Sequence, residues 1–341
     1  MGDYERMKII HIATRMGHHS LHSGYDRLSD YIQCEIFDSG YVSKGMGLIP
    51  DRLWGLLLRR SKFYLVPEMK REINLQVRAL FYSKSIFHFL YGENDFRIFR
   101  PQKKHKLFVT YHFPPEKYCQ YFPKPPNLER ANAIIVVGSN QVDYFARWIP
   151  KEKILFIPHG IDTEYYMPAE NEIRGYKILF VGTHLRDFDI LKGVIERIEK
   201  LSINLSFTIV TFKENWKIFQ GLKKIELVDG VTEAKLLQLY QNHALLFLPL
   251  IDGTANNTLL EAASSGLPII TTDIGGVRDY LDDETVIFLR SREIDTVVST
   301  IMDILNDVRK RKELATKARQ KMLSYDWKVI AETMEKVYEV Y

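Results

Sequence analysis

Short apolar runs alternate along the chain with longer segments whose apolar residues recur at helical spacing. In the first half, the runs that predict strands are Lys8 to Ala13, Ser85 to Leu90, Lys106 to Tyr111 and Ala133 to Val137. Each run is short and bounded by polar residues or glycine, which is the pattern of strands buried on both faces of a parallel sheet. The alternation of such runs with helices predicts a doubly wound α/β domain.

The second half restarts the same alternation after a break near Pro158 and Gly160. The predicted strands here are Lys177 to Val181, Leu205 to Thr211, Lys224 to Val228, Leu245 to Leu248, Pro268 to Thr271 and Val286 to Leu289. The predicted helices are one that ends near Lys200, then Thr232 to Gln241, Ala255 to Ser265, Glu293 to Asn306, Val308 to Leu323 and Trp327 to Tyr341. Because 341 residues exceed the size at which one core usually splits, the pattern predicts two domains.

The stretch from Leu248 to Tyr280 carries the most specific chemistry. Its predicted helix begins in the turn Gly253 to Thr258, and a helix start offers unpaired N–H groups and a positive dipole end to an anion such as a diphosphate. Glu261 follows Asn257 by four residues, so both lie on one helix face, where a carboxylate can accept hydrogen bonds from the two hydroxyls of a ribose. An ordinary capped helix with a solvent-exposed glutamate explains the same residues, so both interpretations stand at this point.

Loops that follow predicted strands carry further polar residues, and such loops line the binding crevice of parallel sheets. His18, His19 and His22 follow the first strand and can ligate a metal, bind a substrate or face water. Since no carboxylate or cysteine joins them, a metal site is not expected. His112 stands at a strand end, where it can contact substrate or be an ordinary satisfied polar residue. Arg186 follows the first strand of the second half and can clamp a diphosphate through two parallel hydrogen bonds.

Cysteine usage and the apolar runs bear on the compartment. The two cysteines, Cys34 and Cys119, have no C-x-x-C spacing, so neither a disulfide framework nor a zinc site is expected. The first residues carry charges before an apolar run too short for a signal peptide, and no run approaches the roughly 18 apolar residues that span a bilayer. We therefore expect a cytoplasmic protein, either free or peripheral on the inner face of the cell membrane.

The net charge of +4 conceals an asymmetry between the halves. Residues 1–157 contain 24 Lys and Arg against 15 Asp and Glu, whereas the remainder contains 23 against 28. Part of the basic excess falls in the segment Arg52 to Arg71, where it alternates with Trp54 and several leucines. Such a segment fits an interfacial helix on an anionic membrane, and it fits equally a core-packed helix with a solvated basic face. No nucleic-acid partner is expected.

Motifs of several other classes are absent or out of context. There is no G-x-x-x-x-G-K-[ST] and no G-x-G-x-x-G after a strand, which disfavours a P-loop ATPase and a nicotinamide dehydrogenase. Asp187-Phe188-Asp189 imitates the D-x-D motif of metal-dependent sugar transferases, but its context differs. We interpret this triplet as a charged helix start.

Several short motifs, taken in order, resemble those of glycosyltransferase family 4, a group of retaining transferases with the GT-B fold. The motifs are the Gly24 turn, Ile157 to Asp162, Phe180 to Gly182, Leu259 to Ala262 with Gly266 to Pro268, Gly275-Gly276, and the closing Asp326-Trp327 helix. The resemblance extends over nearly the whole chain. It implies two Rossmann-like, doubly wound domains facing a central cleft: residues 1–157 bind the acceptor, residues 158–325 bind a nucleotide sugar, and helix 326–341 packs towards the first domain.

The same resemblance assigns roles to individual residues. It implies catalytic groups at His112, Arg186 and Asp252. It implies donor contacts at Gly24, Gly182, Arg186, Lys192, Thr254, Asn256, Asn257, Thr258 and Glu261. Glu261 matches the second, ribose-binding acid of the family's E-x7-E element, whereas the first acid would fall on Gly253, and the nearest acid, Asp252, gives D-x8-E instead. Neither a metal nor a further cofactor is expected, because the nucleotide sugar is a substrate.

The function implied is transfer of a sugar, with retention of its anomeric configuration, from a nucleotide sugar to a lipid-linked or polysaccharide acceptor in cell-envelope or exopolysaccharide biosynthesis. In such a hexosyltransferase, helix-end N–H groups and an arginine stabilise the departing diphosphate. Two alternatives remain. One is a GT-B epimerase or hydrolase that turns over the donor without an acceptor, and the other is a catalytically silent nucleotide-binding module docked on a membrane.

Overall fold

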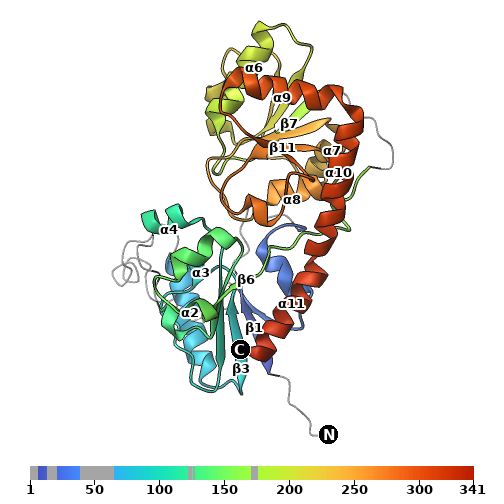
Figure 1. Cartoon of the computed structure of the whole chain (residues 1–341). Helices are drawn as coiled ribbons and strands as arrows, with labels where there is room; N and C mark the ends of the chain where they lie inside the picture. Colours follow the sequence, from blue (N-terminus) through green and yellow to red (C-terminus); the bar gives the residue numbers. More distant parts are fainter. Residues whose placement is uncertain (1–6, 14–20, 39–64, 122–124, 126, 170–175) are drawn as a thin grey trace. The chain divides into compact units, whose positions relative to one another are not determined.

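The structure, a computed structural model, describes residues 7–13, 21–38, 65–121, 125, 127–169 and 176–341 (Figure 1). It divides into two compact units. Unit 1 comprises Met1–His19, Gly24–Gly160 and Trp327–Tyr341, and unit 2 comprises Ser20–Ser23 and Ile161–Asp326. Each unit is built on a six-stranded parallel sheet, which confirms the predicted doubly wound α/β class.

The sheet of unit 1 has the strand order β2-β1-β3-β4-β5-β6. The strands are β1 Lys8–Ile12, β2 Glu35–Phe37, β3 Ser85–Phe89, β4 Lys106–Tyr111, β5 Ala133–Val136 and β6 Ile154–Phe156. In the register, Ile10 stands beside Phe87, and Phe87 stands beside Leu107. The sequence pattern did not predict β2, because its three residues of mixed burial contain no apolar run.

The helices of unit 1 flank its sheet (Figure 1). They are η1 Tyr25–Asp30, α2 Val66–Ala79, α3 Gly92–Asp95, α4 Pro115–Tyr121, η3 Leu128–Arg130, η4 Ser139–Gln141, α5 Val142–Phe145, η5 Lys151–Lys153 and α11 Trp327–Val340, where η marks a 3-10 helix. α2 begins with Pro67 in its first turn, where a missing N–H is tolerated. The Glu68 side chain accepts a hydrogen bond from the Leu65 N–H at 3.1 Å and so closes the helix start.

The basic segment predicted at Arg52 to Arg71 is described only from residue 65 onward. There Lys70 and Arg71 are buried, so they face neither lipid nor water. Arg71 pairs with Asp95 and donates to the Ala13 carbonyl at 3.2 Å, which satisfies a cation that would otherwise be costly to bury. Both interpretations of an exposed basic face are therefore wrong for these two cations. The rest of the segment lies outside the described residues.

The C-terminal helix α11 belongs to unit 1. Its Tyr338 hydroxyl lies 3.0 Å from His11 Nε2 on β1 and also contacts His88 Nδ1 on β3. Burial lowers the pKa of His11 to about 3, so this junction holds a neutral imidazole. At the helix start, the Trp327 ring packs on Gly160 so closely that a Cβ at this glycine would lie 2.3 Å from the ring.

The sheet of unit 2 has the strand order β12-β11-β10-β7-β8-β9. The strands are β7 Lys177–Val181, β8 Ser206–Val210, β9 Ile225–Val228, β10 Leu245–Leu248, β11 Ile269–Thr272 and β12 Ile287–Leu289. This is the strand order of a Rossmann sheet, in which two halves wind outward from a central pair, here β7 and β10. The six predicted strands of this half are confirmed to within two residues at each end.

The helices of unit 2 lie on both faces of its sheet. They are α6 Phe188–Lys200, η6 Lys213–Phe219, α7 Glu233–Asn242, α8 Asn257–Ser264, η7 Val277–Asp279, α9 Ile294–Asn306, α10 Val308–Met322 and η8 Leu323–Tyr325. α6 contacts α9 and α8 contacts α10, and Figure 1 shows the two pairs on opposite sides of the sheet. Gly193 permits the first of these contacts, because a Cβ there would lie 2.8 Å from Ile294.

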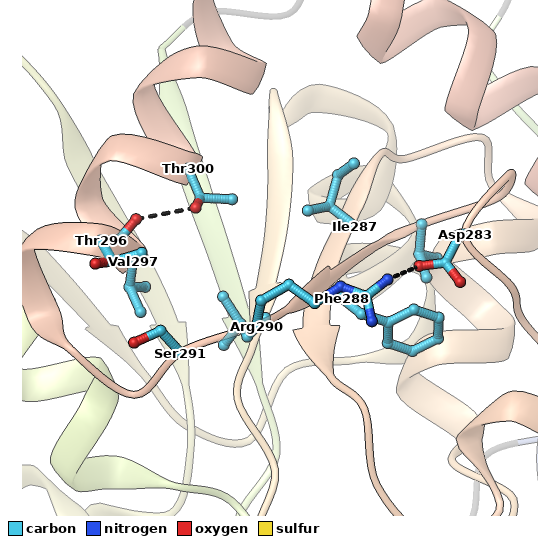
Figure 2. A pocket seen from close by; sticks show the side chains of 10 residues that line it. Asp283, Ile287, Phe288, Arg290, Ser291, Thr296, Val297 and Thr300 are labelled. Carbon is cyan, nitrogen blue, oxygen red and sulfur yellow. Dashed lines mark hydrogen bonds and ion pairs between the residues drawn. The ribbon is translucent and has the colours of Figure 1, made fainter.

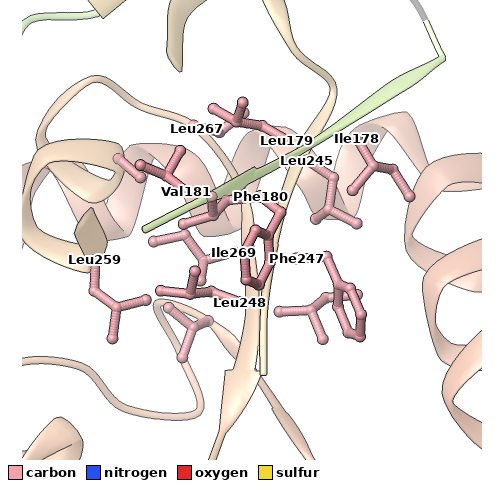
Figure 3. Packing of buried hydrophobic residues seen from close by; sticks show 14 of the residues in the cluster. Ile178, Leu179, Phe180, Val181, Leu245, Phe247, Leu248, Leu259, Leu267 and Ile269 are labelled. Carbon is pink, nitrogen blue, oxygen red and sulfur yellow. The ribbon is translucent and has the colours of Figure 1, made fainter. Parts of the chain in front are cut away.

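A continuous apolar core holds the central strands of unit 2. Figure 3 shows Phe180 of β7 near Leu248 of β10 and Ile269 of β11, and all three side chains are fully buried. Burial of each such side chain contributes about 1.5–3 kcal/mol. This packing fixes the carboxyl ends of the strands, from which the polar loops depart. Within the described ranges, no helix is long and apolar enough to cross a bilayer.

Candidate functional site

The polar loops of unit 2 converge where its strand order reverses, between β7 and β10. In open α/β sheets, ligands bind at the carboxyl ends of the strands at this point. The loops after the two strands are joined by backbone hydrogen bonds of 3.0 Å, one from Asp187 N to Pro249 O and one from Ile251 N to Leu185 O. Leu185 has φ +56°, a left-handed conformation that costs energy for a residue with a Cβ and that often marks functional loops.

A third loop, after β11, supports the loop after β10. Gly276 N donates to Gly253 O at 2.9 Å. Gly275 has φ +57°, and a Cβ there would lie only 2.1 Å from the Gly253 carbonyl, so glycine alone permits this approach. Asp252, which is half-buried, accepts a hydrogen bond from the Gly253 N–H through Oδ1 at 2.7 Å. The D-x8-E acid is thus held at the tip of a braced loop.

The start of α8 presents its N–H groups at this edge. The helix begins at Asn257 rather than at Ala255, because Asn256 is its N-cap and accepts a hydrogen bond from Leu259 N at 3.4 Å. That bond occupies one N–H of the first turn and leaves those of Asn257 and Thr258 without a helical acceptor. Thr254, just before the cap, is buried. The arrangement suits an anion, and anion binding at this turn stays a prediction.

Arg186 is buried beside the start of α8, with 9% of its surface exposed. Its guanidinium donates to Val181 O at 2.9 Å, to His184 O at 2.9 Å and to Thr258 Oγ1 at 3.1 Å. A guanidinium has five N–H donors, so one remains on Nη1 and one on Nη2. Burial lowers the pKa of Arg186 to about 10, which leaves it a cation at neutral pH and gives a bound anion a poorly hydrated partner.

Gly182 and Lys192 are the other predicted donor contacts near β7. Gly182 has φ +103°, and a Cβ there would lie 2.6 Å from Arg186 Nη2, so this glycine makes room for the guanidinium. Lys192 lies in the second turn of α6, with its Nζ 3.7 Å from the Glu196 carboxylate and its side chain 42% exposed. The described geometry therefore joins Gly182 to Arg186, whereas Lys192 is paired elsewhere.

Glu261 is buried on α8, with 4% of its surface exposed, so the interpretation of a solvent-exposed glutamate is wrong. Its Oε2 accepts a hydrogen bond from the Tyr240 hydroxyl on α7 at 2.8 Å. Burial raises the pKa of Glu261 to about 7, while the hydrogen bond from Tyr240 opposes this shift. Sequence reasoning missed Tyr240, because nothing in its spacing shows that it meets a residue on another helix.

Unit 1 contributes a histidine–carboxylate pair at the carboxyl edge of its own sheet. His112 follows β4, and its Nδ1 lies 3.0 Å from Glu93 Oε1 on α3, just after β3. Glu93 is almost fully buried and so fixes the orientation of the ring. Glu93 was also missed, although its place after a predicted strand is a usable signal. Gly24, with φ +103°, is the N-cap of η1 in the same unit.

Of the three histidines that follow β1, the structure describes only His22. His18 and His19 lie outside the described residues. His22 stacks on Tyr165 with ring centroids 3.7 Å apart, and its Nδ1 lies 2.7 Å from Asp162 Oδ2. Among the residues that the structure describes, no group of three or more His, Cys, Asp or Glu could hold a metal ion. Asp187 caps α6 by accepting from Ile190 N at 3.1 Å, which confirms the helix-start interpretation of Asp187-Phe188-Asp189.

A cavity of about 240 Å³ lies elsewhere in unit 2, between the edge strand β12 and α9. Figure 2 shows Arg290 reaching across it to pair with Asp283, beside the apolar side chains of Ile287 and Phe288. β12 is two strands removed from β10 in the sheet, so this cavity is distinct from the loops at β7 and β10. Its volume is below the roughly 300–1,000 Å³ of small-molecule sites, and its charged residues Asp283 and Arg290 already pair with each other.

Comparison with solved structures identifies the fold. The chain matches a sucrose-phosphate synthase from Thermosynechococcus elongatus with a TM-score of 0.72 and 15% identity, over 98% of both chains. It matches the Anabaena protein Alr3699/HepE in complex with UDP-glucose with a TM-score of 0.72 and 13% identity, over 98% of this chain and 100% of that one. The fold is therefore that of the GT-B glycosyltransferases, as predicted.

Sequence comparison finds similarity to glycosyltransferases, mostly in the second unit. Residues 175–307 match the family described as Glycosyl transferases group 1. A curated relative, the phosphatidylinositol N-acetylglucosaminyltransferase gpi3 subunit of Schizosaccharomyces pombe, is 24% identical over 202 residues, which are 55% of this chain and 44% of the relative. The chain thus spans less than half of that relative. The match of residues 175–307 to this family model and the similarity to named glycosyltransferases confirm the resemblance to glycosyltransferases.

Proposed function

We propose that this protein is a metal-independent glycosyltransferase of family 4 that takes its sugar from a nucleotide sugar. The observation that carries the proposal is the convergence, at the strand reversal of a family domain, of a helix start, a buried arginine and a buried glutamate. These three groups have the chemistry that a nucleoside diphosphate requires, because its phosphates are anionic and its ribose carries a vicinal diol. The UDP-glucose bound to the structurally similar Anabaena protein makes uracil the first base to test.

Each group takes one part of the donor in this proposal. The N–H groups of Asn257 and Thr258, with Thr254 and Asn256 beside them, cradle the diphosphate. The two remaining N–H groups of Arg186 stabilise the charge that grows on the leaving group, and Gly182 keeps that guanidinium in place. Glu261 binds the ribose hydroxyls, and Asp252 contacts the hydroxyls of the sugar. Lys192 and Gly24 complete the donor contacts in the proposal.

The proposed reaction retains the anomeric configuration. The bond from the anomeric carbon to the diphosphate oxygen breaks, the bond from that carbon to the acceptor oxygen forms on the same face, and the acceptor proton passes to the departing diphosphate. The developing anion is stabilised by fixed donors in a partly desolvated site, which is the largest contribution that such a site makes to rate. His112, oriented by Glu93, contacts the transferring sugar and serves acceptor positioning.

The acceptor we propose is lipid-linked or a polysaccharide of the cell envelope. A lipid acceptor is supported by the printed name of the S. pombe relative, which acts on phosphatidylinositol. A surface of unit 1 also suits a membrane: Val77, Leu80 and Phe81 at the end of α2 are exposed, with Arg78 and Lys84 exposed among them. Apolar side chains ringed by cations fit an anionic bilayer surface, so we propose a cytoplasmic protein that binds the inner membrane face peripherally.

The surface is tested by sedimentation with anionic vesicles. Replacing Leu80 and Phe81 together by serine should reduce the bound fraction severalfold, because about 0.8 kcal/mol is lost for each CH₂ withdrawn from the bilayer. Val340→Ser is the matched control, since Val340 is also exposed in unit 1 but stands at the end of α11. Equal sedimentation of all three proteins would contradict the membrane proposal.

The reaction itself is tested by a donor screen followed by an acceptor screen. The full chain is incubated with UDP-, GDP- and ADP-sugars, with and without a lipid extract, and the nucleotide released is measured by mass spectrometry. We expect release from one donor class only when the extract is present. Release without an acceptor would indicate a hydrolase, and conversion of the donor into an isomeric nucleotide sugar without release would indicate an epimerase. Binding without release under any condition would indicate a catalytically silent module, and absence of both would overturn the proposal.

A further inference from the structure

The Tyr240 hydroxyl lies directly behind the carboxylate of Glu261. Tyr240 stands near the end of α7 and has no exposed surface, and its hydroxyl donates to Glu261 Oε2 at 2.8 Å. A buried tyrosine hydroxyl needs a partner, and a hydrogen bond to a charged acceptor is among the stronger ones in proteins. Tyr240 therefore fixes one of the two carboxylate oxygens in space.

Burial alone would favour the neutral form of this carboxyl. The groups that face it are Tyr240 and Glu233 from α7, Tyr166 from the chain that enters unit 2, and Arg186 from the loop after β7. Burial and Glu233 raise the pKa of Glu261, whereas Tyr240, Tyr166 and Arg186 lower it. Tyr240 and Tyr166 both lower the pKa through side-chain hydrogen bonds, and the hydrogen bond from Tyr240 to Oε2 measures 2.8 Å.

We propose that Tyr240 is a positioning residue of the donor site, which engages Glu261 Oε2 so that Oε1 is directed at the vicinal hydroxyls of the ribose. The inference rests on the proposed function, since it needs Glu261 to bind a ribose. Tyr240 does not itself touch the donor. It acts by orienting the carboxylate and by favouring its charged form, which is the form that accepts from both hydroxyls.

The test compares a ribonucleotide with its 2′,3′-dideoxy analogue on Tyr240→Phe. First, UDP, GDP and ADP are titrated into the wild-type full chain by calorimetry, and the base that binds is kept. Wild type should bind the ribonucleotide at least tenfold more tightly than the dideoxy analogue. In Tyr240→Phe that preference should fall to about threefold or less, because Glu261 Oε2 loses the donor that orients the carboxylate. Binding of the dideoxy analogue should stay within twofold, which also shows that the variant is folded.

The pH profile gives a readout that a merely structural tyrosine would not move. Ribonucleotide affinity should be high where Glu261 is ionised and should fall as the pH drops through its pKa, near 7 in the unbound protein. Because the Tyr240 hydrogen bond lowers this pKa, Tyr240→Phe should move the midpoint to higher pH. Tyr325→Phe is the matched control, since Tyr325 also lies in unit 2 and donates one 2.8 Å hydrogen bond, to Asp279 O.

The outcomes separate the two proposals. If wild type discriminates between the nucleotides and Tyr240→Phe discriminates equally, with an unshifted midpoint, the role of Tyr240 is wrong and the proposed function stands. If Tyr325→Phe matches Tyr240→Phe, the effect is general loss of packing and the role is again wrong. If wild type binds none of the three nucleotides, both proposals fall.

Discussion

The two units are built on similar sheets, but their strand orders reverse at different places. Unit 1 reverses between β1 and β3, and unit 2 reverses between β7 and β10. At the reversal of unit 2, the loops are joined by two backbone hydrogen bonds of 3.0 Å and braced by a third loop through Gly253 and Gly276. At the carboxyl edge of unit 1, the described polar groups meet through side chains, as Glu93 meets His112. Loop geometry in unit 2 is therefore set by the backbone itself.

The charged groups at the carboxyl edges of the two sheets also differ. Unit 2 buries a cation and a carboxylate at one edge, Arg186 and Glu261, and burial shifts the pKa of each towards its neutral form. Charged groups that are buried and poorly hydrated interact strongly with a ligand of opposite charge or with its hydrogen-bonding groups. Unit 1 holds the His112 imidazole against Glu93 and also buries the ion pair of Arg71 with Asp95. We expect substitutions in unit 2 to change donor binding, and substitutions at the edge of unit 1 to change turnover.

Arg186→Ala should have the largest effect on the reaction. It removes the cation that we propose stabilises the leaving group, and it also leaves the carbonyls of Val181 and His184 without their donor. We expect kcat to fall roughly 10²–10³-fold, as for other fixed donors at a developing anion. Initial rates with the donor identified by the screen measure this. Arg319→Ala, which removes a half-buried arginine elsewhere in unit 2, is the control, and an equal loss there would contradict the assignment.

Gly275→Ala should break the bracing of the loop after β10. The added Cβ would meet the Gly253 carbonyl at 2.1 Å and would sit on a backbone with φ +57°. The strain and the clash together should cost about 2–4 kcal/mol of unfolding free energy, measured by urea denaturation, and nucleotide affinity should fall with it. Gly230→Ala has the same sign of φ with no atom within 4 Å, so it should cost only the backbone strain. Equal losses in the two variants would show that the loop contact is unimportant.

Glu93→Gln probes the edge of unit 1. Glutamine keeps the size of the side chain but removes the charge that orients His112 through Nδ1. We expect kcat to fall about 10- to 100-fold, in the range found for residues that orient a functional histidine, while nucleotide affinity stays within twofold. Kinetics and calorimetry on the same preparation measure both quantities. A loss of nucleotide affinity with kcat unchanged would contradict the expectation that this edge of unit 1 affects turnover and not donor binding.

Lys192→Ala should have the smallest effect of the four. Its Nζ is 3.7 Å from Glu196 and its side chain is nearly half exposed, and exposed pairs contribute about 0–1 kcal/mol. We expect donor affinity to fall by no more than about threefold, which calorimetry resolves. A loss as large as that of Arg186→Ala would show that Lys192 swings onto the donor when it binds.

The sheets could be predicted from the sequence because strands buried in a parallel sheet consist of continuous runs of apolar residues. β4, β7 and β10 were predicted with their observed bounds. β2 was not, because an edge strand of three residues needs no apolar run. The start of α8 was placed two residues early, since Asn256, Asn257 and Thr258 are all good capping residues and only the backbone decides among them.

Some residues of the candidate site could likewise be predicted from the sequence, and others could not. Arg186 was proposed because it follows a predicted strand, and Glu261 because it lies near the start of a predicted helix. Both positions can be recognised from the sequence alone. Tyr240 stands 21 residues before Glu261 on a separate helix, and Glu93 stands 19 residues before His112. Residues so far apart in the sequence show no regular spacing that would predict their contact. Burial of Glu261 was equally invisible, because its short helix contains enough small and apolar residues to be covered on both sides.

Calorimetric titration of the full chain with UDP, GDP and ADP tests the central claim, that unit 2 binds a nucleoside diphosphate through Glu261. Glu313→Ala serves as the control, since Glu313 is a half-exposed helical glutamate of the same unit that pairs with Lys317. One nucleotide should bind wild type and Glu313→Ala with equal affinity, and Glu261→Ala should bind it at least a hundredfold more weakly. Equal binding by Glu261→Ala, or no binding of any of the three nucleotides to wild type, would contradict the account.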